Sequence, residues 1–169
     1  FDIESALREA KRPLILAGNG INCAQARNEF IDFVQRTNIP VVTSYNAVDL
    51  FPSVYSNFVG RVGIKGTRAG NFAMQNCDLL LVIGCRLPVP VTGYNYKTFA
   101  REAKVIVVDI DKDEHSKETV KIDRFIHRDA KDFLKITLFD REKNDWNEIC
   151  RLWKKKWPVC PDENPSEKV

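Results

Sequence analysis

Short apolar runs alternate with amphipathic stretches from the start of the chain to about Asp140. Each apolar run is bounded by polar or glycine-containing segments, as is typical of strands that are covered on both faces of a sheet. The runs that predict strands are residues 14–17, 39–45, 77–84, 103–111 and 119–127.

The stretches between these runs follow a helical period. They predict helices over residues 4–11, 66–77 and 129–138, and a longer helix that starts at Asn22. Asn22 is suited to cap this longer helix, because Gln25 follows three residues later, close to a capping box. The apolar face of that helix is formed by Ala26, Phe30, Phe33 and Val34.

Strands that alternate with helices predict right-handed βαβ units, in which a parallel sheet carries helices on both faces. At 169 residues the chain is long enough to bury one core. The pattern therefore predicts a three-layer α/β domain of Rossmann-like type. In such a sheet, ligands bind beyond the carboxyl ends of the strands, at the point where the strand order reverses.

The character of the chain changes after Asp140. The apolar residues Trp146, Ile149, Cys150, Trp153 and Trp157 recur at helical spacing and predict an amphipathic helix over residues 145–157. We therefore divide the chain into an α/β domain, residues 1–140, and an amphipathic helix with a proline-rich linker, residues 141–169. The lysine run at 154–156 is interpreted as a solvated helix face.

Composition and charge exclude several classes of protein. The net charge of +3 is too small to indicate a nucleic-acid partner, and no apolar run is long enough to span a membrane. The five cysteines contain no Cys-x-x-Cys pair, so we predict buried thiols of a reducing cytoplasm and no metal site. His115 and His127 lie apart in sequence, and we assign neither a catalytic role. The chain has no initiator Met and no apolar leader, which we interpret as a piece of a longer cytoplasmic protein.

Four loops leave the predicted carboxyl ends of the strands, and each carries residues suited to a nucleotide. They are Gly18-Asn19-Gly20, residues 60–67, residues 84–93 and residues 109–111. Glycine permits close approach of the backbone, and a helix N-terminus favours an anion. An aspartate after a buried strand can accept hydrogen bonds from ribose hydroxyls, and Lys65 or Arg86 can meet a phosphate.

The first loop departs from the dinucleotide-binding fingerprint Gly-x-Gly-x-x-Gly, because its third position is Cys23. Thr43 and Ser44 stand where the acidic residue that binds the ribose of NAD is expected. An independent NAD-dependent dehydrogenase is therefore a poor fit. Taken alone, this loop is interpreted as a structural turn between a strand and a helix.

Together, the four loops resemble the central domain of thiamine-diphosphate-dependent enzymes of the acetolactate synthase type. The segments that carry the resemblance are KRPLILAGNG, VGRVGIKGTRAGN, CDLLLVIGCRLPVPVTG, VIVVDID, IHRDAKDFL and WNEICRLWKKKWP. They occur in the family's order and span about residues 6–157. The resemblance implies a six-stranded parallel sheet that lies between two thiamine-diphosphate domains of one chain, in a homo-oligomer such as a dimer or tetramer.

The same resemblance implies that the central domain is not catalytic. In this family the thiamine diphosphate and its Mg²⁺ are held by the flanking domains, through a motif that begins Gly-Asp-Gly. This sequence contains no Gly-Asp-Gly. We therefore expect the parent protein to be a lyase or transferase that acts on a 2-keto acid, and this chain alone to be inert.

In some members of the family the central domain binds FAD or an ADP-type nucleotide. The residues that the resemblance assigns to such a pocket are Gly18, Asn19, Gly20, Gly63, Lys65, Gly66, Thr67, Gly84, Arg86, Asp109, Asp111 and Asp129. This chain departs from the family pattern at several of the surrounding positions, namely Asn19, Lys65, Pro88-Val89-Pro90 and Arg128. Two alternatives stay open: a domain that uses NAD, of dehydrogenase or sirtuin type, and a structural spacer that binds no ligand.

Overall fold

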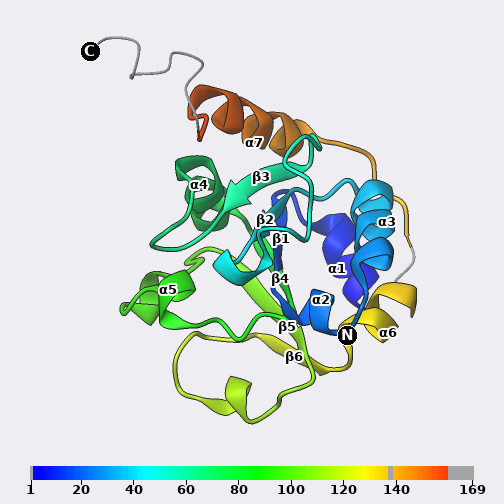
Figure 1. Ribbon diagram of the computed structural model, residues 1–169, viewed down its shortest axis with the longest axis vertical. Helices are drawn as coiled ribbons and strands as arrows, with labels where there is room; N and C mark the ends of the chain where they lie inside the picture. The colour runs from blue at the N-terminus through cyan, green and yellow to red at the C-terminus, as the bar shows by residue number, and fades with distance from the viewer. Residues whose placement is uncertain (1, 137–138, 160–169) are drawn as a thin grey trace.

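The computed structural model describes residues 2–136 and 139–159. Its centre is a six-stranded sheet in which every pair of neighbours is parallel, in the order β3-β2-β1-β4-β5-β6 (Figure 1). The strands are β1 Pro13–Ala17, β2 Val41–Thr43, β3 Phe58–Arg61, β4 Leu79–Ile83, β5 Lys104–Asp109 and β6 Arg124–His127. This confirms the predicted α/β class and the six parallel strands. The order reverses between β1 and β4, which places a topological switch point at their carboxyl ends.

Helices cover both faces of the sheet. The α-helices are α1 Ile3–Glu9, α2 Gly20–Cys23, α3 Arg27–Thr37, α4 Arg68–Asn76, α5 Val89–Thr92, α6 Ala130–Ile136 and α7 Asp145–Lys156. Three single turns of 3₁₀ helix are η1 Tyr45–Ala47, η2 Tyr96–Thr98 and η3 Glu114–Ser116. Within the described residues, none of the helices has both the length and the apolar character that crossing a membrane requires.

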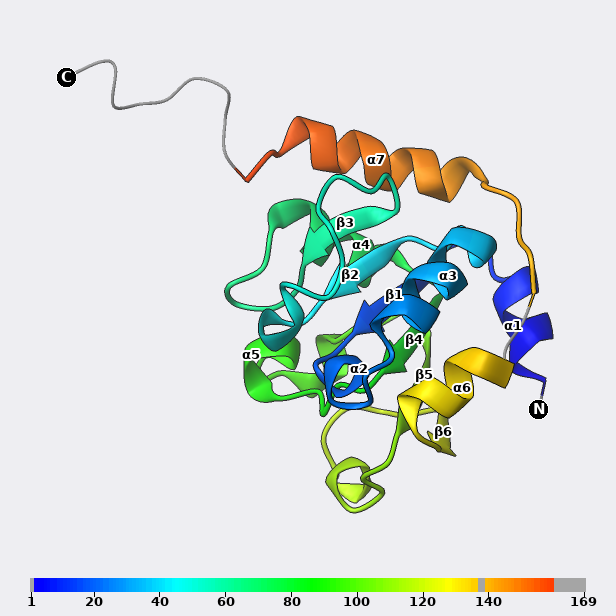
Figure 2. The same cartoon turned by 45° about the vertical axis from the view of Figure 1, so that its right-hand side comes forward.

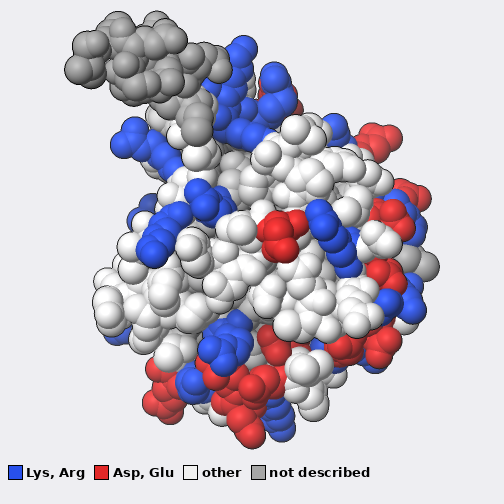
Figure 3. Space-filling view, viewed as in Figure 1, with Lys and Arg blue, Asp and Glu red and all other residues white. Residues whose placement is uncertain are grey.

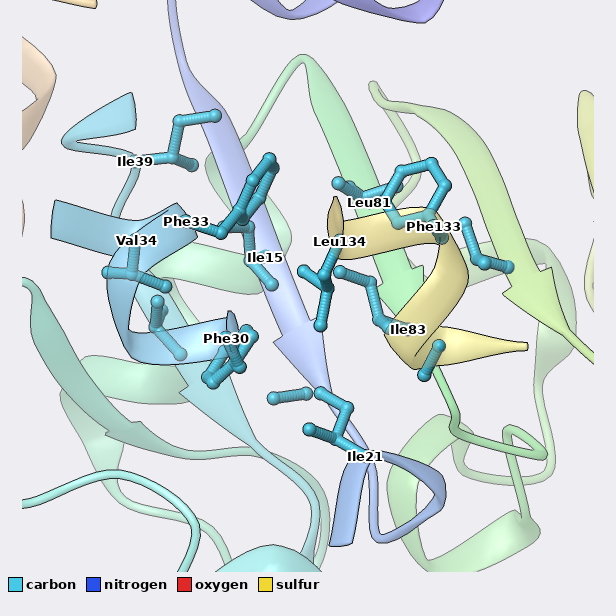
Figure 4. Close-up of a cluster of buried hydrophobic side chains, with 14 of the residues drawn as sticks. Ile15, Ile21, Phe30, Phe33, Val34, Ile39, Leu81, Ile83, Phe133 and Leu134 are labelled. Carbon is cyan, nitrogen blue, oxygen red and sulfur yellow. The ribbon is translucent and has the colours of Figure 1, made fainter. Parts of the chain in front are cut away.

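Alternate residues of the central strands point to opposite faces of the sheet and fill two separate cores. Ile15 and Leu81 belong to one core, with Phe30 and Phe33 of α3 and Phe133 of α6 (Figure 4). The second core contains Leu14, Leu16, Leu80 and Val82, together with side chains of α4 and α7. β1 and β4 are buried at every position, which explains why the sequence shows them as continuous apolar runs.

The prediction that a long helix starts at Asn22 is wrong. A single turn, α2, ends at Cys23, and α3 starts at Arg27 with Ala26 as its N-cap residue. Gln25 adopts a left-handed conformation (φ 52°) between them, and the N–H of Ala26 donates to the Ile21 carbonyl at 3.0 Å. This is the hydrogen bond of a Schellman ending, made here without the usual glycine, so the sequence carries no clear stop signal.

β3 was not among the strands predicted from apolar runs. It is an edge strand with the sequence Phe-Val-Gly-Arg, and only its two middle residues are buried. A four-residue strand with a central glycine has neither the length nor the apolar content of its neighbours. The resemblance to the family supplied the count of six, whereas the residue pattern gave the location of five.

The predicted amphipathic helix is α7, and its tryptophan-bearing side packs against the domain. The Trp146 indole is buried and donates from Nε1 to the Pro13 carbonyl at 3.0 Å. Cys150 lies in the second core beside it, and Trp153 packs against the same core. Figures 1 and 2 both place α7 alongside α4 and β3.

The prediction of buried thiols holds for three of the five cysteines. Cys77, Cys85 and Cys150 are buried, and burial raises the pKa of Cys77 to about 12 and that of Cys85 to about 11. Cys23 is exposed, which corrects the prediction at that position. Cys160 lies outside the described residues.

Candidate nucleotide site at the carboxyl edge

The loops after β1 and β4 meet at the switch point through their backbones. The N–H of Gly18 donates to the Ile83 carbonyl, and the N–H of Gly20 donates to the Gly84 carbonyl, both at 2.9 Å. A Cβ atom on Gly18 would collide with the Gly84 carbonyl oxygen, and one on Gly20 would lie 2.7 Å from the Gly84 Cα. The three glycines are therefore required by the contact between two loops.

The turn that follows β1 has few backbone N–H groups that are free to donate a hydrogen bond to a ligand. The N–H of Ile21 donates to the Gly18 carbonyl at 3.3 Å, and the N–H of Cys23 donates to the Asn19 carbonyl at 3.0 Å. The Asn19 side-chain oxygen accepts from the side-chain amide of Asn22 at 3.2 Å. Because α2 is one turn long, its dipole is small compared with that of a full helix.

The loop after β3 is organised around the start of α4. Thr67 is the N-cap residue of this helix, and its Oγ1 accepts from the N–H of Gly70 at 3.1 Å. The N–H of Gly63 donates to the Asn71 side chain at 2.8 Å. Lys65 is exposed and places its ammonium group 5.1 Å from the centre of the Tyr45 ring. Gly66 lines a groove along α4 with Arg68, Phe72 and Arg101.

The acidic loop after β5 is built around a buried carboxylate. Asp109 is 8% exposed, its Oδ1 accepts from the N–H of Asp111 at 3.0 Å, and its Oδ2 lies 3.4 Å from His115 Nε2. Burial raises the pKa of Asp109, but the His115 ring and the Asp111 N–H outweigh it, so that the net pKa is lowered. Asp111 in turn accepts from the N–H of Glu114, the first residue of η3, at 2.9 Å.

Asp129 occupies the start of α6. Its Oδ1 accepts from the N–H of Lys131 at 2.7 Å, which is the hydrogen bond of a helix cap. Arg128 and Arg86 are exposed. Arg128 is joined to the neighbouring loop through its own N–H, which donates to the Asp109 carbonyl at 3.1 Å.

The structure therefore brings the twelve candidate residues to one edge of the sheet in three groups. The first group follows β1 and β4 at the switch point and consists of Gly18, Asn19, Gly20, Gly84 and Arg86. The second group follows β3 and consists of Gly63, Lys65, Gly66 and Thr67. In the third group Asp109 ends β5, Asp111 follows it, and Asp129 follows β6. The second group is tied to the loop after β4, because the N–H of Ile64 donates to the Pro90 carbonyl at 2.9 Å.

Sequence reasoning did not connect His115 with this edge. The His115 side chain is 3% exposed, its Nε2 lies 3.4 Å from Asp109 Oδ2, and its ring lies 5.4 Å from that of Phe125. The signal that was available is the spacing, since His115 follows Asp109 by six residues in a polar loop. That spacing alone does not distinguish a buried partner of Asp109 from an exposed loop residue.

Comparison with known proteins agrees with this architecture. The family model of the thiamine pyrophosphate enzyme central domain matches residues 2–136. The probable acetolactate synthase large subunit of Methanocaldococcus jannaschii is 38% identical over 167 residues, which cover 94% of this chain and 28% of the relative. The acetolactate synthase large subunit of Corynebacterium glutamicum is 34% identical over 176 residues, which cover 98% of this chain and 28% of the relative.

The chain thus spans less than a third of the length of these relatives. Its strand order, the ordered motifs of its loops and the family match all refer to the same domain. The chain belongs to the central-domain family of thiamine pyrophosphate enzymes, of the acetolactate synthase type.

Proposed function

We propose that this chain is the non-catalytic central domain of a thiamine-diphosphate-dependent enzyme that acts on a 2-keto acid, as a carboligase of acetolactate synthase type or as a decarboxylase. The observation that carries the proposal is the similarity over 94% or more of the chain to large subunits named as acetolactate synthases. Thiamine diphosphate would supply the acyl carbanion chemistry when it is bound to the parent protein. The chain lacks Gly-Asp-Gly, so its own residues do not supply the diphosphate motif.

The role we assign to this domain is that of a rigid connecting element. Its central strands β1 and β4 are buried on both faces, and α7 is joined to β1 by the Trp146 hydrogen bond and to α4 by packing. A domain built in this way holds its two ends at a fixed separation. The proposal includes flanking domains in the same chain, a homo-oligomeric parent and a cytoplasmic location.

We propose further that the carboxyl edge does not hold FAD or an ADP-type nucleotide tightly. The N–H groups of Gly18 and Gly20, which a pyrophosphate would use, already donate to carbonyl oxygens. Asp111, Asp129 and Thr67 accept hydrogen bonds from the backbone at the starts of helical turns. Each charged hydrogen bond that a ligand fails to make lowers affinity by about 1.5–3 kcal/mol, so two of them cost a hundredfold or more.

An NAD-using enzyme receives no support from the site geometry. Thr43 ends β2, Ser44 follows it, and both are buried, so that no carboxylate stands where the ribose of NAD would be bound. The spacer alternative is the one that the loop contacts favour for this domain.

The catalytic part of the proposal is tested on the full-length parent protein. With thiamine diphosphate and Mg²⁺ it should consume pyruvate and release CO₂, whereas the 169-residue chain under the same conditions should not. Turnover of pyruvate by the 169-residue chain would overturn the non-catalytic assignment. A full-length protein that leaves pyruvate and other 2-keto acids unchanged would overturn the parent's proposed class.

The nucleotide part of the proposal is tested by calorimetric titration of FAD and of ADP into the 169-residue chain. We expect a dissociation constant no better than tens of micromolar for either ligand, which corresponds to roughly 6 kcal/mol of binding free energy. Sub-micromolar binding would show that the Gly18–Gly20 turn is a working phosphate cradle in spite of its internal hydrogen bonds.

A further inference from the structure

Large apolar side chains are exposed at the carboxyl edge of the sheet. Tyr45 and Val48 follow β2, Ile64 follows β3, Tyr94 follows β4, and Ile110 follows β5. Their exposed fractions run from 48% for Val48 to 83% for Tyr94. We call this set the apolar rim. Its members come from four different loops, so no local sequence feature explains why they gather at one edge.

Contacts join three of the four loops that carry the apolar rim. The Lys65 ammonium group lies over the Tyr45 ring and joins the loops after β2 and β3. The hydrogen bond from the Ile64 N–H to the Pro90 carbonyl joins the loops after β3 and β4. Figure 3 shows that the surface over α5 carries few charged side chains, in contrast to the surface below it. Large exposed apolar side chains that gather on one edge of a domain mark an interaction site.

The polypeptide leaves α7 close to one end of this rim. Trp157 follows α7, and the Arg68 guanidinium lies 5.7 Å from the centre of its ring. Arg68 follows Ile64 of the rim by four residues, at the start of α4. Sequence that continues beyond α7 therefore starts from a point near the loop after β3. The relatives that this chain matches are more than three times as long as the matched segment, so they contain enough sequence to cover an edge of this domain.

We infer that the apolar rim is an interface, covered in the parent enzyme by the domain that follows α7 in the same chain. The inference rests on the proposed function, which supplies that following domain. A protein surface fits the rim better than a nucleotide does, because the rim offers apolar area and aromatic rings while the neighbouring glycine N–H groups are already hydrogen-bonded. Tyr45 and Tyr94 are of the residue type that is enriched at the centres of interfaces.

The inference is tested in the full-length protein by the reactivity of introduced cysteines. In a background of Cys23→Ser and Cys160→Ser, we compare maleimide labelling of Ile64→Cys and Tyr94→Cys with that of Lys121→Cys. The Lys121 side chain is 85% exposed and precedes β6, at the opposite edge of the sheet. Labelling at the two rim positions should be at least about tenfold slower than at Lys121→Cys, because an interface core packs as densely as a protein interior. Equal labelling rates would overturn the inference.

The identity of the covering surface is tested by replacing Tyr94 with the photoreactive residue p-benzoylphenylalanine. Irradiation should give a cross-link within one chain, to a peptide beyond residue 169, and the same residue at Lys121 should give none. A cross-linked product with the mass of two chains, or protection that develops only after FAD is added, would overturn the inference. Pyruvate turnover is measured on the same samples, so an active enzyme with an uncovered rim separates this inference from the proposed function.

Discussion

Gly20 and Gly84 are in contact through their backbones, with the N–H of Gly20 donating to the Gly84 carbonyl at 2.9 Å. A Cβ atom on Gly84 would lie 2.8 Å from the Gly20 Cα, so the exclusion of side chains is mutual. The glycine turn after β1 is thus one half of a junction between two loops. Its sequence is explained by packing before any ligand is considered.

Substitution of Gly20 by alanine should destabilise the protein although alanine favours the helical backbone of α2. We expect a loss of about 2–3 kcal/mol in the free energy of unfolding, because the new methyl group overlaps the backbone of Gly84. Urea unfolding followed by tryptophan fluorescence measures the change.

Gly93→Ala is the matched control for this substitution. Gly93 has a positive φ of 74°, but a Cβ atom there would meet no atom within 4 Å. With φ 74° and ψ 179° the residue lies in a backbone region that is essentially restricted to glycine, so the cost of the substitution should be backbone strain alone, about 1–3 kcal/mol. A loss of less than about 1 kcal/mol for Gly20→Ala would show that close packing does not determine the geometry of the turn.

Asp129 offers a test of whether a candidate site residue serves the fold. Asp129→Ala should lower the free energy of unfolding by about 1 kcal/mol, because it removes the acceptor for the N–H of Lys131 at the start of α6. Asp129→Asn keeps a capping oxygen and should stay close to the wild type. Equal losses in the two variants would show that the negative charge, rather than the cap, is what matters at this position.

The buried strands could be predicted from the sequence because β1, β4 and β5 are central and apolar on both faces. The edge strand β3 could not, since it has only four residues with a central glycine, and part of its cover comes from α7, which lies far from it in sequence. The start of α3 was wrong for a different reason. Gln25 adopts the left-handed conformation that ends α2, and because this position is usually a glycine, the sequence contains no sign of the helix end.

The candidate site divides in the same way. Sequence motifs placed Gly18, Gly84 and Asp109 at one edge of the sheet, and the parallel topology brings them there. A motif does not reveal whether a given N–H group is free to bind a ligand, and the Gly20 N–H already donates to the Gly84 carbonyl. Nor does it reveal a pairing such as that of His115 with Asp109, which depends on how the loop after β5 folds back.

The hydrogen bond from Trp146 to Pro13 should contribute to the attachment of α7. Trp146→Phe keeps an aromatic ring but leaves the Pro13 carbonyl without this donor in a buried position. We expect a loss of about 1–3 kcal/mol in the free energy of unfolding, measured by urea denaturation with circular dichroism. Trp157→Phe, at the surface end of the same helix, should cost less than about 1 kcal/mol. Similar losses from both substitutions would argue against a special role for the buried indole N–H.

The carboxylate of Asp109 should make the stability of the protein sensitive to acid. Its pKa in the folded state is lower than the ordinary value of 3.8, so folding favours the ionised form. Such a group stabilises the folded state above its unfolded-state pKa, and this contribution is lost as the pH falls through the lower, folded-state value. We compare the free energy of unfolding of the wild type with that of Asp109→Asn. The part of the difference that this carboxylate determines should be constant at about pH 5 and above, and it should shrink below pH 3.8.

His115→Gln separates the two groups that lower the pKa of Asp109. This variant removes the imidazole 3.4 Å from Oδ2 but leaves the N–H of Asp111 donating to Oδ1. We expect it to retain part of the acid sensitivity, with a smaller change between pH 5 and pH 2.5 than in the wild type, because one of two stabilising partners remains. Urea unfolding at several pH values provides the measurement. An Asp109→Asn protein that loses stability in acid as steeply as the wild type would show that other carboxylates carry the effect.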